Sequence, residues 1–278
     1  MGHHEMQWSS ATPGLLIILV DQSGSMLSDY DGNDSKIVFA SKAVNRVIDT
    51  IIQKNYDGES PKNRCFISVI GYNNQVKELT SGYLKELDAN TIRVDTIKKK
   101  KPDGAGGIIE VDYRMPIWLD PSAGGATDMK GAFDLAQSII SKWIQNKPNS
   151  PAPVIINISD GAPYYDSKDP DDCMKETIDV AKRIMSMSVA DGNVLIFNAL
   201  IKATGNSVAF PNSIDECTCK EAKFLFEISS PIPDAYKSIA KAKELTIKEG
   251  SRGCIFEADG VQLIQLIDFG SSKGQRDI

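Results

Sequence analysis

The chain has 278 residues, 41% hydrophobic and 24% charged, with a net charge of −6 at pH 7. This composition is typical of a soluble globular protein, and the acidic balance argues against a general nucleic-acid or membrane partner. No apolar stretch approaches the roughly 18 residues of a membrane span, and residues 1–13 lack the basic and apolar regions of a signal peptide. We therefore expect a cytoplasmic protein.

The first part of the chain predicts two buried strands and a helix. The apolar run Leu15–Val20 is short enough to be a fully buried strand. A helix follows, with Asp34 as its cap and apolar residues at helical spacing from Ile37 to Ile52. Cys65–Tyr72 is the second buried strand, and residues 75–79 are its expected hairpin partner.

Residues 80–123 are less regular and predict an elaboration of the core. The lysine run Lys98–Lys101 is followed by a Pro/Gly segment over 102–107, which favours a β-hairpin with its turn at that segment. One lysine run in an acidic chain is more typical of a solvated arm than of a nucleic-acid site. We therefore expect a solvated hairpin at about 80–120.

The second half of the chain alternates between helical and strand patterns. The expected helices run from Met129 to Trp143, over about 171–191, over Pro233–Lys248 and over Val261–Phe269. The expected strands are Pro153–Ser159, Val194–Ile201, Phe224–Ile228 at a sheet edge, and Cys254–Ala258. Such alternation is typical of an α/β fold with a doubly wound, mostly parallel sheet and helices on both faces. Because no repeat or low-complexity linker divides the chain, we expect one domain over 13–270, with flexible tails at 1–12 and 271–278.

Three polar loops lie where such a fold places a ligand. Asp21, Ser23 and Ser25 follow the first buried strand, Thr127 lies in the segment GGATD, and Asp160 directly follows a later buried strand. In doubly wound sheets, ligands bind outside the carboxyl ends of the central strands. The first loop supplies one carboxylate and two hydroxyls, a hard oxygen set that suits Mg²⁺ or Mn²⁺ better than zinc.

These loops, DQSGS, GGATD and ISDG, resemble the metal-ion-dependent adhesion site of the von Willebrand factor A (vWA) family in residue identity, order and approximate spacing. The resemblance covers about residues 13–260 and implies a Rossmann-like fold. It implies that Ser23 and Ser25 bind the metal directly and that Thr127 does so in one state. It also implies that Asp21 and Asp160 contact the ion directly or through water, with Mg²⁺, Mn²⁺ or Ca²⁺ as the cation.

The donor set also indicates what the ion binds. Mg²⁺ prefers six oxygen ligands and keeps open positions where the protein offers few carboxylates. When one of the two aspartates contacts the ion only through water, two aspartates and three neutral hydroxyls neutralise the charge of the ion only in part. The ion therefore favours a carboxylate from another molecule. We therefore expect a metal-dependent protein–protein interaction module whose partner supplies an Asp or Glu.

Within the vWA family, the chain is most similar to the single-domain bacterial proteins associated with tellurite resistance. This similarity implies an intracellular signalling or stress-response adaptor, grouped with a protein kinase and a phosphatase. A subunit of an ATPase assembly of the MoxR or chelatase kind is an alternative.

A metal-dependent phosphatase is a further alternative, because an aspartate after a buried strand is typical of a phosphoryl-accepting nucleophile. Phosphatases of the haloacid dehalogenase type carry a second aspartate two residues on, where this chain has Ser23. The only histidines are His3 and His4, and no Walker A motif is present. We therefore expect no enzyme activity.

The cysteines and one tyrosine pair leave smaller questions. The five cysteines are odd in number and scattered, so we expect free thiols rather than a disulfide framework. They are Cys65, Cys173, Cys217, Cys219 and Cys254. No CxxC pair or histidine completes a zinc site with them. Tyr164 and Tyr165 follow the third loop as either interface anchors or packing residues.

Overall fold

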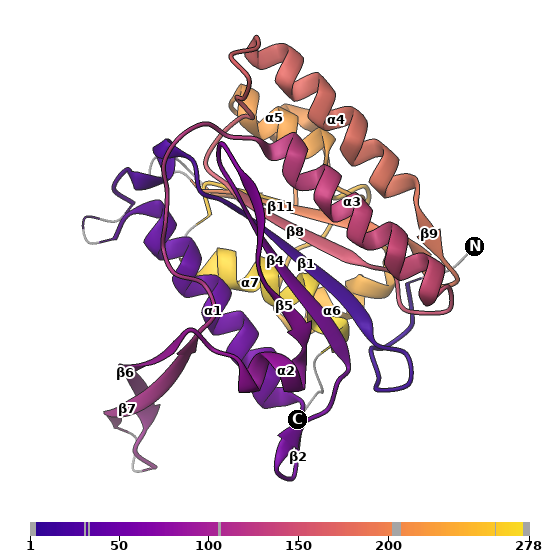
Figure 1. The fold of residues 1–278 in the computed structure, drawn as a ribbon. Coiled ribbons are helices and arrows are strands. Elements are labelled where there is room, and N and C mark those ends of the chain that lie inside the picture. The colour runs from indigo at the N-terminus through magenta and orange to yellow at the C-terminus, as the bar shows by residue number, and fades with distance from the viewer. Residues whose placement is uncertain are drawn as a thin grey trace.

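A seven-stranded sheet forms the centre of the computed structural model, which describes residues 4–30, 32, 34–104, 107–201, 207–258 and 260–274 (Figure 1). The spatial order of the strands is β12-β13-β11-β8-β1-β4-β5. Their bounds are β1 (Gly14–Asp21), β4 (Cys65–Tyr72), β5 (Val76–Tyr83), β8 (Val154–Ser159), β11 (Leu195–Leu200), β12 (Val208–Ala209) and β13 (Cys254–Phe256). The five inner strands are parallel, and β5 and β12 close the two edges antiparallel. The predicted doubly wound, mostly parallel sheet is confirmed.

The inner strands are apolar along their whole length because helices cover both faces of the sheet. Every residue of β1 and β8 is buried. Side chains alternate between the faces of a strand, so Leu16 and Ile18 enter one core while Leu15 and Ile17 enter the other. Continuous apolar runs of this kind are typical of parallel strands that are covered on both sides.

Two groups of helices cover the sheet (Figure 1). One core includes residues of α1 (Lys36–Lys54), α2 (Leu84–Ala89), α6 (Lys237–Ala242) and α7 (Gly260–Gly270). The other includes residues of α3 (Met129–Asn146), α4 (Pro170–Ser186) and α5 (Lys220–Glu227). No helix in the described ranges is long and apolar enough to cross a bilayer.

Short elements complete the described structure. They are η1 (Gly24–Leu27), η2 (Ile214–Glu216), η3 (Asp234–Tyr236), η4 (Ser272–Gly274), β2 (Tyr56–Asp57), β3 (Ser60–Pro61), β9 (Ser188–Val189) and β10 (Gly192–Asn193). The β2–β3 and β9–β10 pairs are small antiparallel hairpins.

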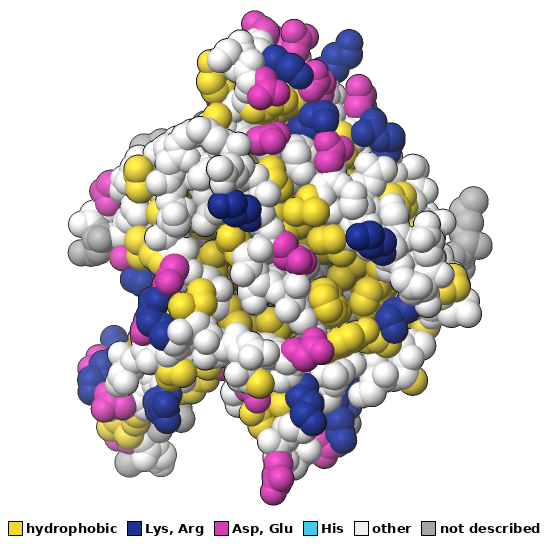
Figure 2. Space-filling model, viewed as in Figure 1, with side chains coloured by type: hydrophobic (Ala, Val, Ile, Leu, Met, Phe, Trp, Pro, Cys, Tyr) yellow, Lys and Arg dark blue, Asp and Glu magenta, His cyan; other side chains and the backbone are white. Residues whose placement is uncertain are grey.

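The predicted β-hairpin is confirmed as an arm of two strands, β6 (Arg93–Pro102) and β7 (Ile108–Ile117), that projects from the body of the protein (Figure 1). Part of its turn, residues 105–106, lies outside the described residues. In Figure 2 the arm, at lower left, carries basic and acidic side chains close together. Lys98 and Asp112 form one such cross-strand pair, 2.5 Å apart and well exposed, as expected of a solvated arm.

Buried polar contacts fix the base of the arm to the domain. The Trp118 indole is buried and donates a hydrogen bond from Nε1 to the Leu87 carbonyl, at 2.8 Å. Asn45 Oδ1, on α1, accepts hydrogen bonds from the amides of Trp118 and Leu119 at 2.9 and 3.0 Å. Further along the arm, the Tyr113 hydroxyl donates to Asp49 Oδ2, on α1, at 2.5 Å, so the arm is held to the domain both at its base and through α1.

Two predicted boundaries differ from the structure at the ends of helices. Ser35, not Asp34, is the residue before the first turn of α1. The helix expected over 171–191 ends at Ser186, because residues 188–193 form the β9–β10 hairpin.

The predicted edge strand at Phe224–Ile228 is wrong, because Phe224, Leu225 and Phe226 lie in α5. A short apolar run cannot be assigned to strand or buried helix from its periodicity alone. The antiparallel edge is formed by β12 instead.

The helix predicted over 233–248 is also too long. Only η3 and α6 form there, and α6 ends at Ala242. Glu244 has a left-handed φ of 57°, and the Leu245 amide donates to the Ala240 carbonyl at 2.8 Å. This left-handed residue ends the helix.

The N-terminal segment packs against the domain through Trp8. Its side chain is only 4% exposed within the first core, and its amide donates to the Lys273 carbonyl at 2.9 Å. Gly14 gives the ring its space, since a Cβ there would lie 2.3 Å from a ring carbon. Both ends of this contact fall in stretches that the sequence assigns to flexible tails.

Replacing Trp8 tests whether this segment belongs to the folded domain. Trp8→Ala removes a buried aromatic side chain, so we expect the free energy of unfolding to fall by about 3 kcal/mol. Urea denaturation followed by circular dichroism measures the change, with Gln7→Ala, at an exposed neighbour, as the control. Equal stability of the two variants would show that residues 4–12 are a dispensable tail.

Candidate metal site

The site lies at the carboxyl ends of β1 and β8, which are adjacent parallel strands. Their register runs from Leu16 opposite Val154 to Val20 opposite Ile158. Asp21 ends β1 and Asp160 follows β8, so both carboxylates reach the same edge of the sheet. The chain continues from β1 to β4 on one side, while β8 and β11 lie on the other. This is the switch point at which doubly wound sheets bind ligands.

Asp21 is fully buried and held by two hydrogen bonds. Its Oδ1 accepts from the Ser23 amide at 2.8 Å, and its Oδ2 accepts from Ser159 Oγ at 2.7 Å. The first bond shapes the turn after β1, and the second joins the turn to β8. The Asp21 carboxylate therefore has one fixed orientation.

The Ser23 and Ser25 hydroxyls connect this turn to Asp160. Their Oγ atoms lie 3.1 Å apart, and Ser25 Oγ donates to Asp160 Oδ1 at 2.7 Å. The other oxygen of Asp160, Oδ2, accepts from Lys36 Nζ at 2.7 Å. Four of the five predicted residues thus form one group of carboxylates and hydroxyls at this edge of the sheet.

Backbone hydrogen bonds hold the Thr127 loop beside the other two loops. It pairs with Tyr164, on the loop after Asp160, by amide-to-carbonyl hydrogen bonds of 2.7 and 3.0 Å. The Gly24 amide donates to the Gly125 carbonyl at 3.0 Å, which fixes this loop to the first. Thr127 is buried, and its side chain makes no hydrogen bond to the other four predicted residues, all of which the structure describes.

Gly125 is needed where these loops meet. Its φ of 83° is a left-handed conformation that other residues rarely adopt. A Cβ at this position would lie 2.4 Å from Asn74 Oδ1, so the space is also closed. The glycines of GGATD therefore let the Thr127 loop approach the first loop.

Burial raises the pKa of Asp21 to about 6, although hydrogen bonds from Ser23 and Ser159 lower it. An ionised carboxylate in a buried place is costly unless a cation or further donors compensate it. A cation beside Asp21 favours its ionised form. The environment of Asp21 thus matches a group that gains from a nearby positive charge.

The residues present fit a hard divalent cation. In the part of the chain that the structure describes, no three or more His, Cys, Asp or Glu side chains are arranged to hold a metal. A metal at this edge would therefore depend on serine and threonine hydroxyls together with two carboxylates. Such an all-oxygen set suits Mg²⁺, Mn²⁺ or Ca²⁺ and is a poor match for zinc.

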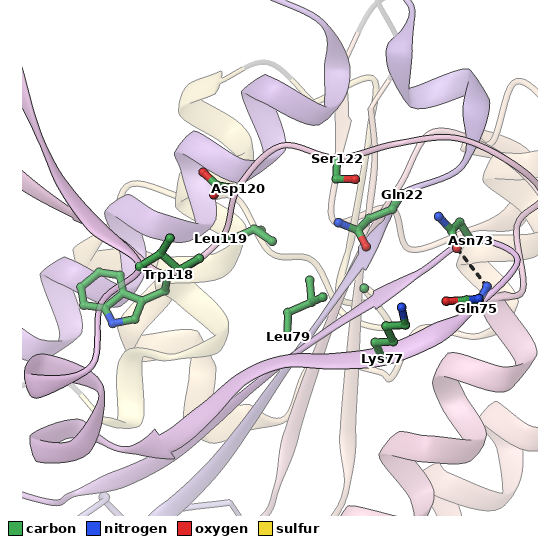
Figure 3. A pocket seen from close by; sticks show the side chains of 11 residues that line it. Gln22, Asn73, Gln75, Lys77, Leu79, Trp118, Leu119, Asp120 and Ser122 are labelled. Carbon is green, nitrogen blue, oxygen red and sulfur yellow. Dashed lines mark hydrogen bonds between the residues drawn. The ribbon is translucent and has the colours of Figure 1, made fainter.

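A cavity of about 340 Å³ adjoins the first loop on the β4–β5 side (Figure 3). Gln22, between Asp21 and Ser23, lines it together with Leu79 and Trp118. Lys77 and Asp120 add charges of both signs to its wall. The cavity therefore presents a mixed polar and apolar surface beside the first loop, and none of the five predicted site residues lines it.

Sequence reasoning missed two residues of the site, Ser159 and Lys36. Ser159 has a local signal, because it directly precedes Asp160 at the end of a buried strand. Lys36 has none, since it lies 124 residues from Asp160 in the chain.

Tyr164 and Tyr165, considered as interface anchors or as packing residues, differ in their surroundings. Tyr164 is 49% exposed beside Thr127, where it is accessible to a partner. Tyr165 is buried and donates a hydrogen bond to Glu176 at 2.8 Å, so it is a packing residue. None of the five cysteines forms a disulfide, and all except Cys219 are buried.

No protein-family model matches the sequence, and neither does any curated protein. Among solved structures, the pilus adhesin SpaC from Lactobacillus rhamnosus GG is 13% identical, with a TM-score of 0.53 over 97% of this chain and 31% of that one. The manganese-loaded TRAP protein of Plasmodium vivax is 14% identical, with a TM-score of 0.45 over 92% and 72%. The vWF domain of the type V pili tip protein Mfa5 from Porphyromonas gingivalis is 15% identical, with a TM-score of 0.35 over 55% and 39%.

The likeness to SpaC, at this low identity, concerns the fold alone. This chain has a doubly wound, mostly parallel sheet with helices on both faces, as in a Rossmann-like fold, and three loops lie at the carboxyl ends of its strands. The matches span about a third of the length of the adhesin and two fifths of the Mfa5 chain.

Removing the Ser159 hydroxyl tests its role in holding Asp21. Ser159→Ala leaves Oδ2 of the buried carboxylate without its donor, so we expect a loss of about 1–3 kcal/mol in the free energy of unfolding. Chemical denaturation measures this loss, and Ser138→Ala on the exposed side of α3 is the control. In an Asp21→Asn background the loss should differ, because contacting residues are energetically coupled. Additive losses would contradict a direct contact.

Proposed function

We propose that the protein is a metal-dependent protein–protein interaction module. The observation that carries the proposal is the continuous group of oxygen donors from Ser23 through Ser25 to Asp160, beside the buried Asp21. Loops that are distant in sequence meet there at the switch point of the sheet. Burying polar groups together in this way costs free energy. A bound cation would offset that cost by interacting with them.

In this proposal the Ser23 and Ser25 hydroxyls hold the ion, and Thr127 joins them in one state. Asp21 and Asp160 supply its negative charge directly or through water. Ser159 orients Asp21, so that its carboxylate cannot turn away from the site. The ion is Mg²⁺, with Mn²⁺ and Ca²⁺ as the other hard cations that fit.

The bound ion offers an open coordination position to an oxygen ligand of a partner. An Asp or Glu side chain of another protein is the natural donor, because two aspartates and neutral hydroxyls leave the ion short of negative charge. The exposed ring of Tyr164 lies beside Thr127 and provides apolar contact area next to that position.

We place this interaction in the cytoplasm. The absence of a disulfide among the five cysteines supports a reducing compartment. The resemblance of the sequence to bacterial tellurite-resistance-associated proteins supports a signalling or stress-response adaptor, with a kinase, a phosphatase or an ATPase complex as its partner.

Metal binding is tested by calorimetry. We expect the wild-type protein to bind one Mg²⁺ or Mn²⁺ ion, and the double variant Asp21→Asn, Ser23→Ala to lose about 100-fold or more in affinity as direct ligands are removed. Ser138→Ala, at an exposed position of α3, is the control. Undiminished binding in the double variant would place the metal elsewhere or remove it from the proposal.

Partner binding is tested by affinity capture in Mg²⁺ and in EDTA, with mass spectrometry to identify the retained protein. We expect a partner that the wild-type protein retains only in Mg²⁺ and that Ser23→Ala does not retain. Replacing one Asp or Glu of that partner by Asn or Gln should abolish retention. Equal retention in EDTA would contradict a metal-bridged contact.

A further inference from the structure

Lys36 forms a largely buried ion pair with Asp160 inside the candidate metal site. Nζ lies 2.7 Å from Oδ2, and the two side chains are 13% and 4% exposed. The second oxygen of Asp160 already accepts from Ser25. The ammonium group is therefore a positive charge placed on an oxygen that the divalent ion also needs.

Its place in the helix makes this lysine notable. Lys36 is the first residue of α1, a helix of 19 residues with no acidic residue in its first turn. The partial positive charge of a helix N-terminus repels a cation there. Burial of the ammonium adds a desolvation cost. The ion pair with Asp160 offsets both costs. It therefore holds the Lys36 side chain toward the candidate metal site.

We propose that Lys36 is a tethered cation that competes with the divalent ion for Asp160 and thereby sets the metal affinity of the site. This inference rests on the proposed function and concerns the same site. In the metal-free protein the ammonium neutralises Asp160. When a divalent ion binds, two like charges face one carboxylate, so the Lys36–Asp160 pair must weaken or separate.

The competition also selects for ionic charge. A monovalent ion that replaces the ammonium exchanges one positive charge for another and gains little. A divalent ion brings a second charge, which the buried Asp21 carboxylate, held only by the neutral Ser23 amide and Ser159 hydroxyl, can compensate. Lys36 thereby disfavours the binding of Na⁺ and K⁺. It also makes the affinity for divalent ions lower than the same oxygen ligands would give without the lysine.

Lys36→Met tests the inference, because methionine keeps an unbranched apolar side chain and removes the charge. We expect Lys36→Met to bind Mn²⁺ about tenfold more tightly or better in calorimetry at fixed pH and salt, since one charge–charge repulsion is removed. Lys36→Arg keeps the charge and should bind no more tightly than wild type. Lys42→Met is the matched control on the same helix, since Lys42 is 66% exposed and pairs with Asp34 at 2.5 Å.

Melting temperature without and with Mn²⁺ is the second readout. The metal-free Lys36→Met variant should melt lower than wild type, because Asp160 is left without its partner, and saturating Mn²⁺ should reduce this difference. If the variant does not fold without metal, Lys36→Met with Asp160→Asn should restore the fold, since the uncompensated charge is removed.

Three results would overturn the inference, and they differ in what they say of the proposed function. If wild type and Lys36→Met bind Mn²⁺ equally, Lys36 does not compete and the metal site itself stands. If neither protein binds Mn²⁺ or Mg²⁺, the proposed function fails and the inference fails with it. Tighter binding in Lys36→Arg as well would assign the effect to packing and overturn the role of charge.

Discussion

The parallel pairing of β1 with β8 is the constraint on which the rest of the structure depends. It aligns the carboxyl ends of two fully buried strands, so that polar groups after one strand must be satisfied by polar groups after the other. The Ser159 hydroxyl meets the Asp21 carboxylate for this reason. The two aspartates reach the same edge of the sheet because the strands end side by side.

The site balances its charges through two small clusters. Asp21 is held by neutral donors, the Ser23 amide and the Ser159 hydroxyl, whereas Asp160 is held by a hydroxyl and by the Lys36 ammonium. The Ser23–Ser25 contact joins the two clusters. Within the described residues, Asp160 therefore has a full counter-charge, whereas Asp21 is held by neutral donors alone.

The sequence predicted most of the sheet, because continuous apolar runs mark covered parallel strands and because the polar loops follow them directly. It failed at Phe224–Ile228, where a short apolar run fits helix and strand equally well, and at the end of α6, where a left-handed Glu244 stops the helix. The Lys36–Asp160 pair was beyond sequence reasoning for another reason. Its partners are joined only by the three-dimensional path of the chain, and neither carries a local pattern that points to the other.

The pairing of β1 with β8 also has a consequence for the order in which the sheet forms during synthesis. Ser25 and Asp160 are separated by 135 residues, and β1 must wait for β8 before its second edge is covered. Contacts of such long range slow folding, and an uncovered apolar strand is prone to pair with other chains. During synthesis, β1 is therefore exposed on one edge until more than half of the chain has left the ribosome. The Ser25–Asp160 contact can therefore form only after β8 is in place, while β11 and β13 are still to be added to the sheet.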